Sequence, residues 1–292
     1  MKIALYGRPF SEDCKKNISE LFQILEDRKT ELFIYRPFLD FLRTQEGIKP
    51  VIRGTYESHD DIPRDIQFMF SVGGDGTFLK TVSIIQDYGI PIAGINIGRL
   101  GFLANITVEN LASSIRAILE GHYSIEHRSL IKLDLSDGTL SGFCCALNDV
   151  TIQKRYSSMI TIHAYLNDVL LNSYWADGLI ISTPTGSTAY SLSVGGPIAT
   201  PDSNNFIISP LAPHNLTVRP VIVPDSKVIR LKIESRDSSF ILSIDSRVEI
   251  LDSTPEIIIR RADFDVKTIR IEGNSFYDNL RHKLMWGLDR RN

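Results

Sequence analysis

The fold class of the first part of the chain is indicated most clearly by the stretch Ile66-Gln67-Phe68-Met69-Phe70-Ser71-Val72-Gly73-Gly74-Asp75-Gly76-Thr77. Its first seven residues are mostly apolar, which is typical of a short buried strand. The glycines end that strand, and the apolar spacing over Thr77–Asp87 predicts a helix. A further apolar run of strand length follows at Ile90–Ile95. A strand, a glycine turn, a helix and a second strand in this order indicate a parallel sheet covered by helices.

The same alternation extends on both sides of this stretch. Apolar spacing predicts further strands and helices at Lys2–Gly7, Ser11–Asp27, Glu31–Tyr35, Phe38–Arg43 and Val108–Glu120. We therefore expect an α/β domain with a parallel sheet in the first part of the chain, and we place it at residues 1–105.

The character of the chain changes near residue 123. From there to about residue 270 it is rich in short β-branched or alternating runs, among them Ser141–Ile152, with turn signals such as Asp137-Gly138 between them. Many short strands with one brief helical insert predict an all-β, sandwich-like domain, which we place at residues 106–270. Residues 271–292 form the third part, in which Ser275 to Asn292 has the pattern of a basic helix.

Composition excludes several classes of protein. The chain has 292 residues, of which 43% are apolar, so it can build a sizeable core. With 32 basic and 35 acidic residues its net charge is 32 − 35 = −3, and nothing in this balance favours nucleic acid as a partner. No stretch approaches the roughly 18 consecutive apolar residues of a membrane span, so we expect no membrane association.

Other signals point to the cytoplasm and away from a protein-bound metal. The apolar N-terminus Met1–Tyr6 is too short for a signal peptide and is interrupted by Gly7, Arg8 and Pro9. The three cysteines do not form a disulfide pattern, which favours a reducing compartment. The six histidines are scattered, and neither HExxH nor CxxC occurs, so no resident metal site is predicted.

The loop Gly73–Thr77 is the first candidate for chemistry. Glycines let a ligand approach the backbone, and exposed amides at the start of a helix favour phosphate. A carboxylate adds nothing to simple phosphate binding, because like charges repel. Asp75 therefore indicates a general base or a contact to a phosphate-bound metal, while a cap on the following helix is the structural alternative. Lys80, one helical turn after Gly76, is a candidate phosphate contact, although a solvated helix lysine is the simpler interpretation.

A second candidate is the run from Asp177 to Ser193, where an apolar strand enters a turn rich in Ser and Thr. Hydroxyls and amides at a helix N-terminus suit phosphates or sugars, and Tyr190 could stack on a base. An ordinary capped helix is the alternative. The third candidate, Asn148-Asp149, is a polar pair inside an apolar run and needs partners there, either ribose hydroxyls or a neighbouring loop.

Together these motifs resemble the NAD kinases of the bacterial, ATP-dependent type, which convert NAD to NADP. The resemblance runs from Lys2 to about Gly287. The stretches that carry it are Gly73–Thr77, Gly98–Leu103, Asn148-Asp149, Asp177-Gly178, Thr183–Tyr190, Gly195–Ile198, Pro213–Leu216, Asp245–Arg247 and Leu280–Gly287. Phosphofructokinases and diacylglycerol-type lipid kinases share the glycine loop, whereas the Thr183–Tyr190 block is far more specific to this family.

The resemblance implies an N-terminal α/β domain, a C-terminal β-sandwich and a final helix that returns to the first domain. It implies that Asp75 accepts the proton of the adenosine ribose 2′-hydroxyl and that a divalent metal, Mg²⁺ or Mn²⁺, arrives with ATP. Relatives commonly self-associate, so a homo-oligomer is expected. The ligand-binding residues that it implies are Asp75, Gly76, Asn148, Asp149, Ser158, Asp177, Thr188, Ala189, Tyr190, Ser191, Leu192 and Ser193. Lys80 and Arg247 complete the predicted set as candidate phosphate contacts, chosen for their charge and position.

Two positions depart from the family pattern. Asp149 stands where relatives usually carry Glu, and its shorter side chain can still accept from ribose hydroxyls. Arg247 stands where relatives often carry Gln; it cannot accept a hydrogen bond but could attract a phosphate. These departures leave room for a second hypothesis, an NAD(P)-binding sensor with weak catalysis. A lipid kinase that uses the same glycine loop is the third.

Overall fold

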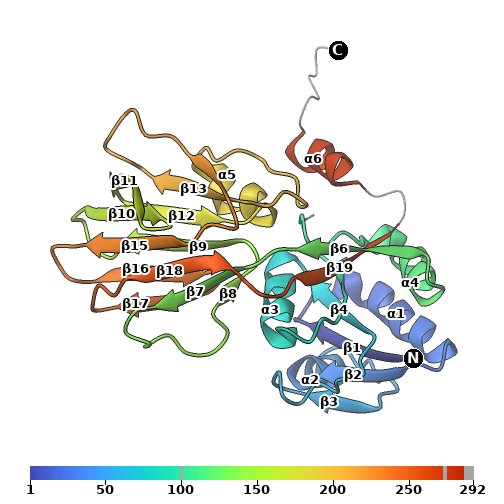
Figure 1. Ribbon diagram of the computed structural model, residues 1–292. Helices are drawn as coiled ribbons and strands as arrows, with labels where there is room; N and C mark the ends of the chain where they lie inside the picture. The colour runs from blue at the N-terminus through green and yellow to red at the C-terminus, as the bar shows by residue number, and fades with distance from the viewer. Residues whose placement is uncertain (99–100, 272–274, 286–292) are drawn as a thin grey trace, which may run out of the picture. The chain divides into compact units, whose positions relative to one another are not determined.

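The computed structural model describes residues 1–98, 101–271 and 275–285. The chain forms two compact units, one made of Met1–His127 with Val266–Asn292 and the other of Arg128–Asp265 (Figure 1). Each unit has its own apolar core. In the described part of the chain, no helix has both the length and the apolar character needed to cross a membrane.

The first unit is built on a seven-stranded sheet with the strand order β3-β2-β1-β4-β5-β19-β6. The strands β1 to β5 pair in parallel, and β19 adds in parallel to β5 through Thr268 and Ile92. Their bounds are β1 Lys2–Gly7, β2 Glu31–Tyr35, β3 Gly54–Tyr56, β4 Phe68–Gly73, β5 Ile92–Asn96, β6 Tyr123–Arg128 and β19 Val266–Ile271.

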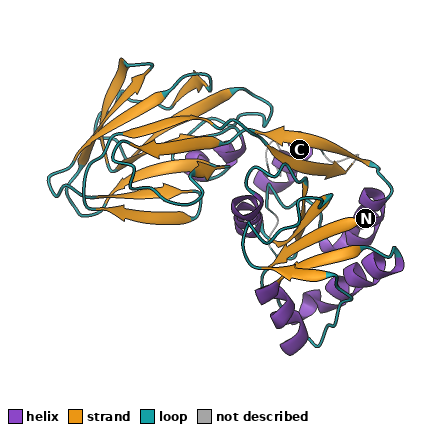
Figure 2. Ribbon diagram, turned by 60° about the horizontal axis from the view of Figure 1, so that its bottom comes forward, coloured by secondary structure: helices purple, strands orange, loops and turns teal. Residues whose placement is uncertain are grey.

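Helices gather around this sheet, as Figure 2 shows. Those before residue 120 each turn an apolar stripe inward, as Ile18, Leu21 and Leu25 do in the first helix. The strand β4 is buried along its whole length, as expected for a central parallel strand. The helices are α1 Lys15–Asp27, α2 Arg36–Thr44, α3 Asp75–Ile85, α4 Leu111–Leu119 and α6 Phe276–Leu284, with short 3-10 turns at Glu12–Cys14 and Val108–Asn110.

The second unit consists of two six-stranded sheets, with the orders β11-β10-β15-β18-β7-β8 and β14-β13-β12-β9-β16-β17. A 3-10 turn, Thr185–Thr188, and the short helix α5, Tyr190–Ser193, follow β12. The strands are β7 Ile131–Leu135, β8 Cys145–Ala146, β9 Asp149–Lys154, β10 Ile160–Leu166, β11 Val169–Ala176, β12 Gly178–Ser182, β13 Asn205–Leu211, β14 Val221–Pro224, β15 Ile229–Glu234, β16 Phe240–Ile244, β17 Arg247–Leu251 and β18 Ile257–Arg261.

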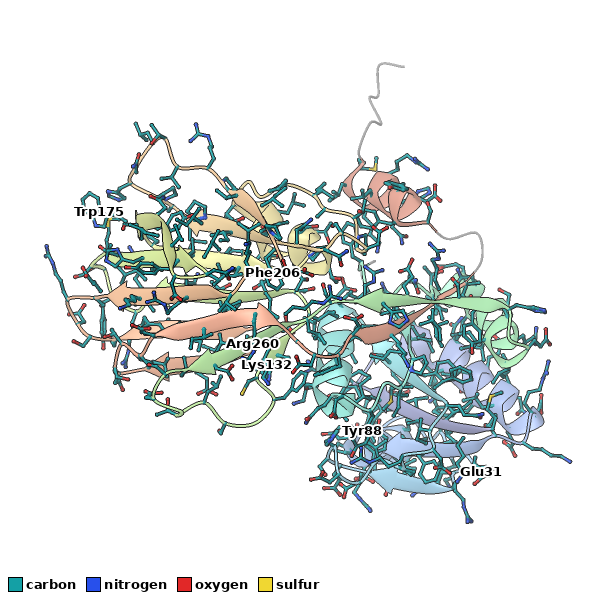
Figure 3. All side chains as sticks on the ribbon, viewed as in Figure 1. Glu31, Tyr88, Lys132, Trp175, Phe206 and Arg260 are labelled. Carbon is teal, nitrogen blue, oxygen red and sulfur yellow. The ribbon has the colours of Figure 1, made fainter. Side chains whose placement is uncertain are left out.

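The inner faces of these two sheets share one apolar core. Ile162 of β10 and Leu231 of β15 belong to it from one sheet, and Ile181 of β12 and Phe206 of β13 from the other. All four are fully buried, and Phe206 is labelled in Figure 3. The alternation of buried and half-exposed residues in β10 (Ile160–Leu166) is the pattern of a sheet with one face on a core. The second unit is therefore a β-sandwich.

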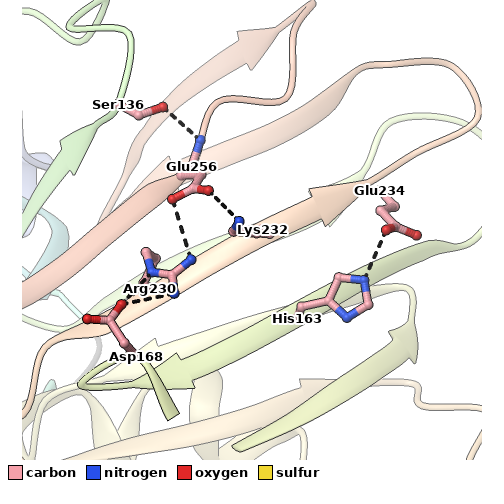
Figure 4. Close-up of polar contacts among 7 residues, drawn as sticks. All are labelled: Ser136, His163, Asp168, Arg230, Lys232, Glu234 and Glu256. Atoms are coloured by element: carbon pink, nitrogen blue, oxygen red, sulfur yellow. Dashed lines mark hydrogen bonds and ion pairs between the residues drawn. The ribbon is translucent and has the colours of Figure 1, made fainter. Parts of the chain in front are cut away.

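The outer face of β10, β15 and β18 carries charged side chains (Figure 4). The Glu256 carboxylate lies 2.8 Å from Lys232 Nζ and 3.6 Å from an Nη of Arg230, which also pairs with Asp168 at 2.9 Å. Such solvent-facing pairs typically stabilise by no more than about 1 kcal/mol each. This face gives the sheet a polar outer surface, while the fold rests on the core beneath it.

The predicted fold class is confirmed: an α/β unit, an all-β unit and a C-terminal helix. The predicted domain bounds of 1–105, 106–270 and 271–292 differ from the observed division after His127 and before Val266. The reason is packing, because Leu111, Ile115 and Ile118 of α4 are buried in the core of the first unit. The α6 helix belongs to the first unit, as the resemblance implied, although residues 286–292 of the predicted helix lie outside the described residues.

The prediction of a single strand over Ser141–Ile152 is wrong. This segment forms two strands in different sheets, since β8 pairs with β7 and β9 pairs with β12 and β16. The chain crosses between the sheets at Leu147 and Asn148, where the backbone leaves both ladders. A buried backbone amide needs a partner wherever the ladder ends, and a side chain from elsewhere in the sequence supplies it, as described below.

Candidate functional site

The glycine loop lies at the carboxyl end of β4, where Gly74 caps α3 and Asp75 begins it. The Asp75 carboxylate turns away from its own helix and accepts three backbone hydrogen bonds from residues 102–104. Oδ2 accepts from the Phe102 amide at 2.6 Å, and Oδ1 accepts from the amides of Leu103 at 2.9 Å and Ala104 at 3.1 Å. The helix-cap alternative for Asp75 is thus wrong, because Gly74 is the cap and no side chain caps the helix.

These contacts fix the orientation of the carboxylate and leave it partly available. Each carboxylate oxygen has two lone pairs. The two amides on Oδ1 occupy both of its lone pairs, whereas Oδ2 receives one amide and keeps one lone pair. The loop passes so close that any side chain at Gly101 would collide with the Asp75 carboxylate. A carboxylate held in one orientation with a free lone pair has the geometry of a general base.

Three further candidate residues of the first unit lie on α3 and α6. Gly76 and Lys80 are exposed on α3. Lys283 of α6 places its ammonium 4.4 Å from the centre of the Phe102 ring. Burial lowers the pKa of Lys283 to about 8, and the negative charge of Asp75 opposes that shift.

In the second unit, Asp245 supplies the partner for the amides at the sheet crossing. It lies between β16 and β17 with φ of +51°, and its carboxylate accepts from three consecutive amides. Oδ2 accepts from Leu147 at 2.9 Å, and Oδ1 accepts from Asn148 at 2.8 Å and Asp149 at 3.2 Å. Asn148 and Asp149 are therefore held at the start of β9 by a residue about a hundred positions away.

The two carboxylates at this crossing influence each other. Burial and the nearby charge of Asp245 raise the pKa of Asp149 to about 7, although the Thr151 hydroxyl donates to it at 3.1 Å. Burial raises the pKa of Asp245 as well, while its three amide donors and the positive charge of Arg247 act in the opposite direction. Asp149 is therefore a buried acid that changes its charge near neutral pH.

Arg247 has a structural role here. Its guanidinium donates to the carbonyl oxygens of Phe143 and Cys145, the latter at 2.5 Å. Its Nη1 and Nη2 atoms are engaged with these backbone carbonyls, and the phosphate attraction considered for Arg247 stays a prediction. Arg247 ties the chain before the crossing to β17.

The Ser/Thr-rich turn is fastened to Asn148. Thr183 Oγ1 donates to the Leu147 carbonyl at 2.5 Å and accepts from the Gly186 amide at 3.1 Å. A side chain at Gly186 would collide with the Asn148 backbone, because a Cβ there would lie only 2.7 Å from the Asn148 Cα. The polar cluster that suggested a ligand thus also builds the turn and holds it against Asn148.

Three of the remaining predicted residues, Tyr190, Asp177 and Ser158, lie around the other end of β9. Tyr190 is 40% exposed, and its hydroxyl accepts from Gln153 Nε2 at 3.1 Å. Asp177 pairs with Lys154 at 2.6 Å, and half-buried Ser158 follows β9. Ser191 hydrogen-bonds to Ser209 at 3.0 Å inside the protein, so its hydroxyl is not presented to a ligand. In the same segment, Thr188, Ala189 and Leu192 are half-buried and Ser193 is exposed.

Three groups at these sites have no role predicted from the sequence. They are the Asp245 carboxylate, the amides of residues 102–104 and the Lys283 ammonium. Apart from the Ala104 amide, each lies inside a stretch that carries the family resemblance, and that resemblance was the available signal. Their partners are 27 to 98 positions away along the chain, or on a different element, so no local pattern could identify them.

Comparison with known proteins bears on both units. A family model described as the ATP-NAD kinase N-terminal domain matches residues 11–123, and one described as the ATP-NAD kinase C-terminal domain matches residues 147–271. The chain is 45% identical over 294 residues to an NAD kinase of Cytophaga hutchinsonii and 42% identical over 292 residues to one of Bacteroides fragilis. Both alignments cover 100% of this chain and 100% of the relative.

Solved structures of related kinases resemble this chain in fold. A yeast NADH kinase complexed with NADH has a TM-score of 0.87 at 24% identity, covering 99% of this chain and 89% of that one, and so shows the shared fold. An NAD kinase from Archaeoglobus fulgidus in complex with ATP has a TM-score of 0.76 at 25% identity, covering 98% of this chain and 99% of that one. The domain models and the full-length relatives place this chain in the NAD kinase family.

Proposed function

We propose that this protein is an NAD kinase that transfers the γ-phosphoryl group of ATP to the 2′-hydroxyl of the adenosine ribose of NAD. The observation that carries the proposal is the Asp75 carboxylate, held by three amides with one lone pair of Oδ2 left free. The relatives named NAD kinase and the structures solved with NADH and with ATP support the two substrates.

The reaction needs a base because a ribose hydroxyl is a poor nucleophile at neutral pH. Asp75 takes the hydroxyl proton while the ribose oxygen forms a bond to the γ-phosphorus. The bond from that phosphorus to its bridging oxygen breaks, and ADP leaves with the electron pair. A positioned base of this kind typically contributes about 10²- to 10⁴-fold in rate. Positioning and charge neutralisation supply the rest.

The second unit supplies polar groups for a dinucleotide. The predicted contacts form two groups. Asn148 and Asp149 lie at the start of β9, and Asp177, Tyr190 and Ser158 lie around its end. At about 3.3 Å per residue, the length of β9 separates the groups by roughly 17 Å. This spacing suits an extended ligand with a nucleoside at each end.

The cation that accompanies ATP is part of the proposal. Within residues 1–98, 101–271 and 275–285, no three His, Cys, Asp or Glu side chains gather as a metal site. We propose that Mg²⁺ or Mn²⁺ enters bound to the triphosphate and neutralises its charge during transfer. Chelation with EDTA should abolish NADP formation, and added Mg²⁺ should restore it. Activity that persists in EDTA would contradict this part of the proposal.

Self-association and a cytoplasmic location complete the proposal. The edge strand β11 exposes Val169, Leu170 and Trp175, and an apolar sheet edge favours pairing with another copy. Light scattering after size exclusion should give a mass above that of one chain; a monomer would count against it. The three cysteines are free thiols, and burial raises the pKa of Cys145 to about 11, which fits unreactive thiols in a reducing compartment.

The decisive experiment incubates the protein with NAD, ATP and Mg²⁺ and measures NADP, beside a panel with NADH and polyphosphate. Asp75→Asn should keep NAD affinity within about threefold and lower kcat about 10²- to 10⁴-fold, because it removes the proton acceptor. Near-normal turnover in this variant would remove Asp75 from the base role. A protein that binds NAD but forms no NADP would favour the sensor.

A further inference from the structure

The C-terminal helix α6 brings a lysine ammonium next to the catalytic loop. Lys283 Nζ is buried and has no hydrogen-bond partner among the described residues. It lies 4.4 Å from the centre of the Phe102 ring, and the Phe102 amide is the donor that holds Asp75 Oδ2 at 2.6 Å. A single residue, Phe102, therefore contacts the general base through its backbone and the lysine through its side chain.

Burying an ammonium in this position costs free energy when no ligand is bound. A buried charge normally has an ion-pair partner and hydrogen-bond acceptors for its protons. The ring of Phe102 offers a cation–π contact but accepts none of the three N–H donors in the ordinary sense. On α6 itself, Asp278 is paired with Arg281, and His282 is exposed. From other elements, Asp75 is the charged group whose attraction acts on Lys283.

An anion with several oxygens would complete this arrangement. We propose that Lys283 binds the oxygens of the phosphoryl group being transferred, and that α6 thereby contributes a phosphate-binding residue to the reaction. This inference rests on the proposed function, because that function places the transferred phosphorus beside Asp75. A phosphoryl group there supplies the acceptors that the ammonium lacks. The ammonium in turn offsets the repulsion between the phosphate oxygens and the Asp75 carboxylate.

The proposed phosphate-binding role of Lys283 can be tested through the pH dependence of activity. Burial brings its pKa down to about 8, so the group is charged at neutral pH and becomes neutral as the pH rises through about 8. Neutral lysine attracts phosphate far less strongly. We therefore expect kcat/KM for ATP to fall as the pH rises above about 8, since kcat/KM reports groups of the free enzyme.

The test compares Lys283→Met, Lys283→Arg and the control Arg281→Met, which lies on the exposed side of the same helix. Lys283→Met should lower kcat/KM for ATP about 10²-fold, the order seen when one preorganised charge stabiliser is removed. It should leave NAD affinity within about twofold. Lys283→Arg should regain most of the loss and keep its activity above pH 8, because arginine stays charged. Arg281→Met should match the parent.

A stability measurement separates a functional role from a structural one. If Lys283 serves phosphate binding, Lys283→Met should unfold at the same or a higher temperature than the parent, because it removes a buried ammonium that hydrogen-bonds to none of the described residues. The proposal is overturned if Lys283→Met stays within threefold of the parent in kcat/KM for ATP. It is also overturned if the variant unfolds at a lower temperature, loses NAD affinity equally and is not rescued by Lys283→Arg.

The two proposals can fail separately. A parent protein that forms no NADP from NAD and ATP removes the proposed function. Calorimetric titration of parent and Lys283→Met with Mg²⁺-ATP, with no NAD present, still tests Lys283. Weaker ATP binding in the variant, with unchanged binding in Arg281→Met, supports the phosphate role, and equal binding overturns it.

Discussion

Three aspartates show how surroundings give one residue type different tasks. Asp75 is half-buried, and its Oδ2 receives one amide and keeps one lone pair free. Asp245 uses its carboxylate to bind three backbone amides and so serves as a structural clamp. Asp149 is buried with a single hydroxyl donor beside another carboxylate, which makes its charged form unfavourable. Asp75 and Asp245 each accept three backbone amides, whereas Asp149 accepts one hydroxyl, so the scarcity of donors is what sets Asp149 apart.

Asp149 predicts a pH dependence of stability. Its pKa is about 7 in the folded protein and near 3.8 when unfolded, so the folded state binds more protons between these values. The free energy of unfolding should therefore fall as the pH rises from about 4 to about 7. Asp149→Asn, which is neutral throughout, should remove this decrease. The measurement is the urea midpoint of parent and variant at pH 5.5 and pH 8.

Asp168→Asn is the matched control for this prediction. Its side chain is 83% exposed in an outer-face ion pair, so its loss should shift the urea midpoint little at either pH. If Asp149→Asn shows the same difference between pH 5.5 and pH 8 as the parent protein, then Asp149 is not the group that titrates.

At the scale of elements, the crossing between β8 and β9 is the critical junction. Two neighbouring strands belong to different sheets, and the Leu147, Asn148 and Asp149 amides between them have the Asp245 carboxylate as their acceptor. The same junction presents Asn148 to the turn at Thr183 and Gly186. The position of the proposed NAD contacts therefore depends on a clamp from the β16–β17 turn.

Asp245→Asn should loosen this junction. The amide group of Asn offers one acceptor oxygen, while its NH₂ group would face backbone N–H donors. A lost charge-assisted hydrogen bond in a buried site costs about 1.5–3 kcal/mol, and we expect that loss in the free energy of unfolding. NAD affinity should fall at least tenfold, because Asn148 and Asp149 lose their support. Denaturant titration and NAD calorimetry are the measurements.

Asp252→Asn provides the comparison for Asp245→Asn. The Asp252 side chain is 78% exposed and pairs with Arg155 at the surface, so its replacement should change stability by less than about 1 kcal/mol. Equal stability and equal NAD affinity in Asp245→Asn and Asp252→Asn would show that the carboxylate does not organise the crossing.

At the scale of the whole molecule, the chain builds two separate cores. Phe70 belongs to the core of the first unit and Phe206 to that of the second, and both are fully buried. The C-terminal segment from Val266 returns to the first unit as β19 and α6. The first unit is therefore built from two segments that lie far apart in the chain.

Because each unit has its own core, a cavity made in one core should destabilise mainly the unit that contains it. Phe206→Ala should cost about 3–5 kcal/mol through the cavity it leaves. It should speed amide hydrogen exchange in β12 and β13 more than in β1 and β4, because local opening follows the weakened core. Phe70→Ala should show the reverse distribution. Exchange that rises equally in both units for either variant would show that the two cores open together.

Much of this architecture could be predicted from sequence patterns. The strands at Lys2–Gly7, Glu31–Tyr35 and Phe240–Ile244 were located, because apolar periodicity depends on neighbouring residues alone. The break at Leu147 was not predicted, since the run Ser141–Ile152 gives no local sign of it and only Asp245 explains why the chain changes sheet. The domain boundary was placed too early for a similar reason, because α4 joins the first unit by packing on distant residues.

Sequence patterns were enough to predict the alternation of elements, the glycine loop before α3 and the family of the chain. The elements and the loop are local features, set by side-chain periodicity and by glycine at a strand end. Three contacts became visible only in the folded chain: the 102–104 amides hold the Asp75 carboxylate, Asp245 clamps the β8–β9 crossing, and Lys283 lies over Phe102. Each is a contact between segments far apart in the chain, which form only when the cores bring them together.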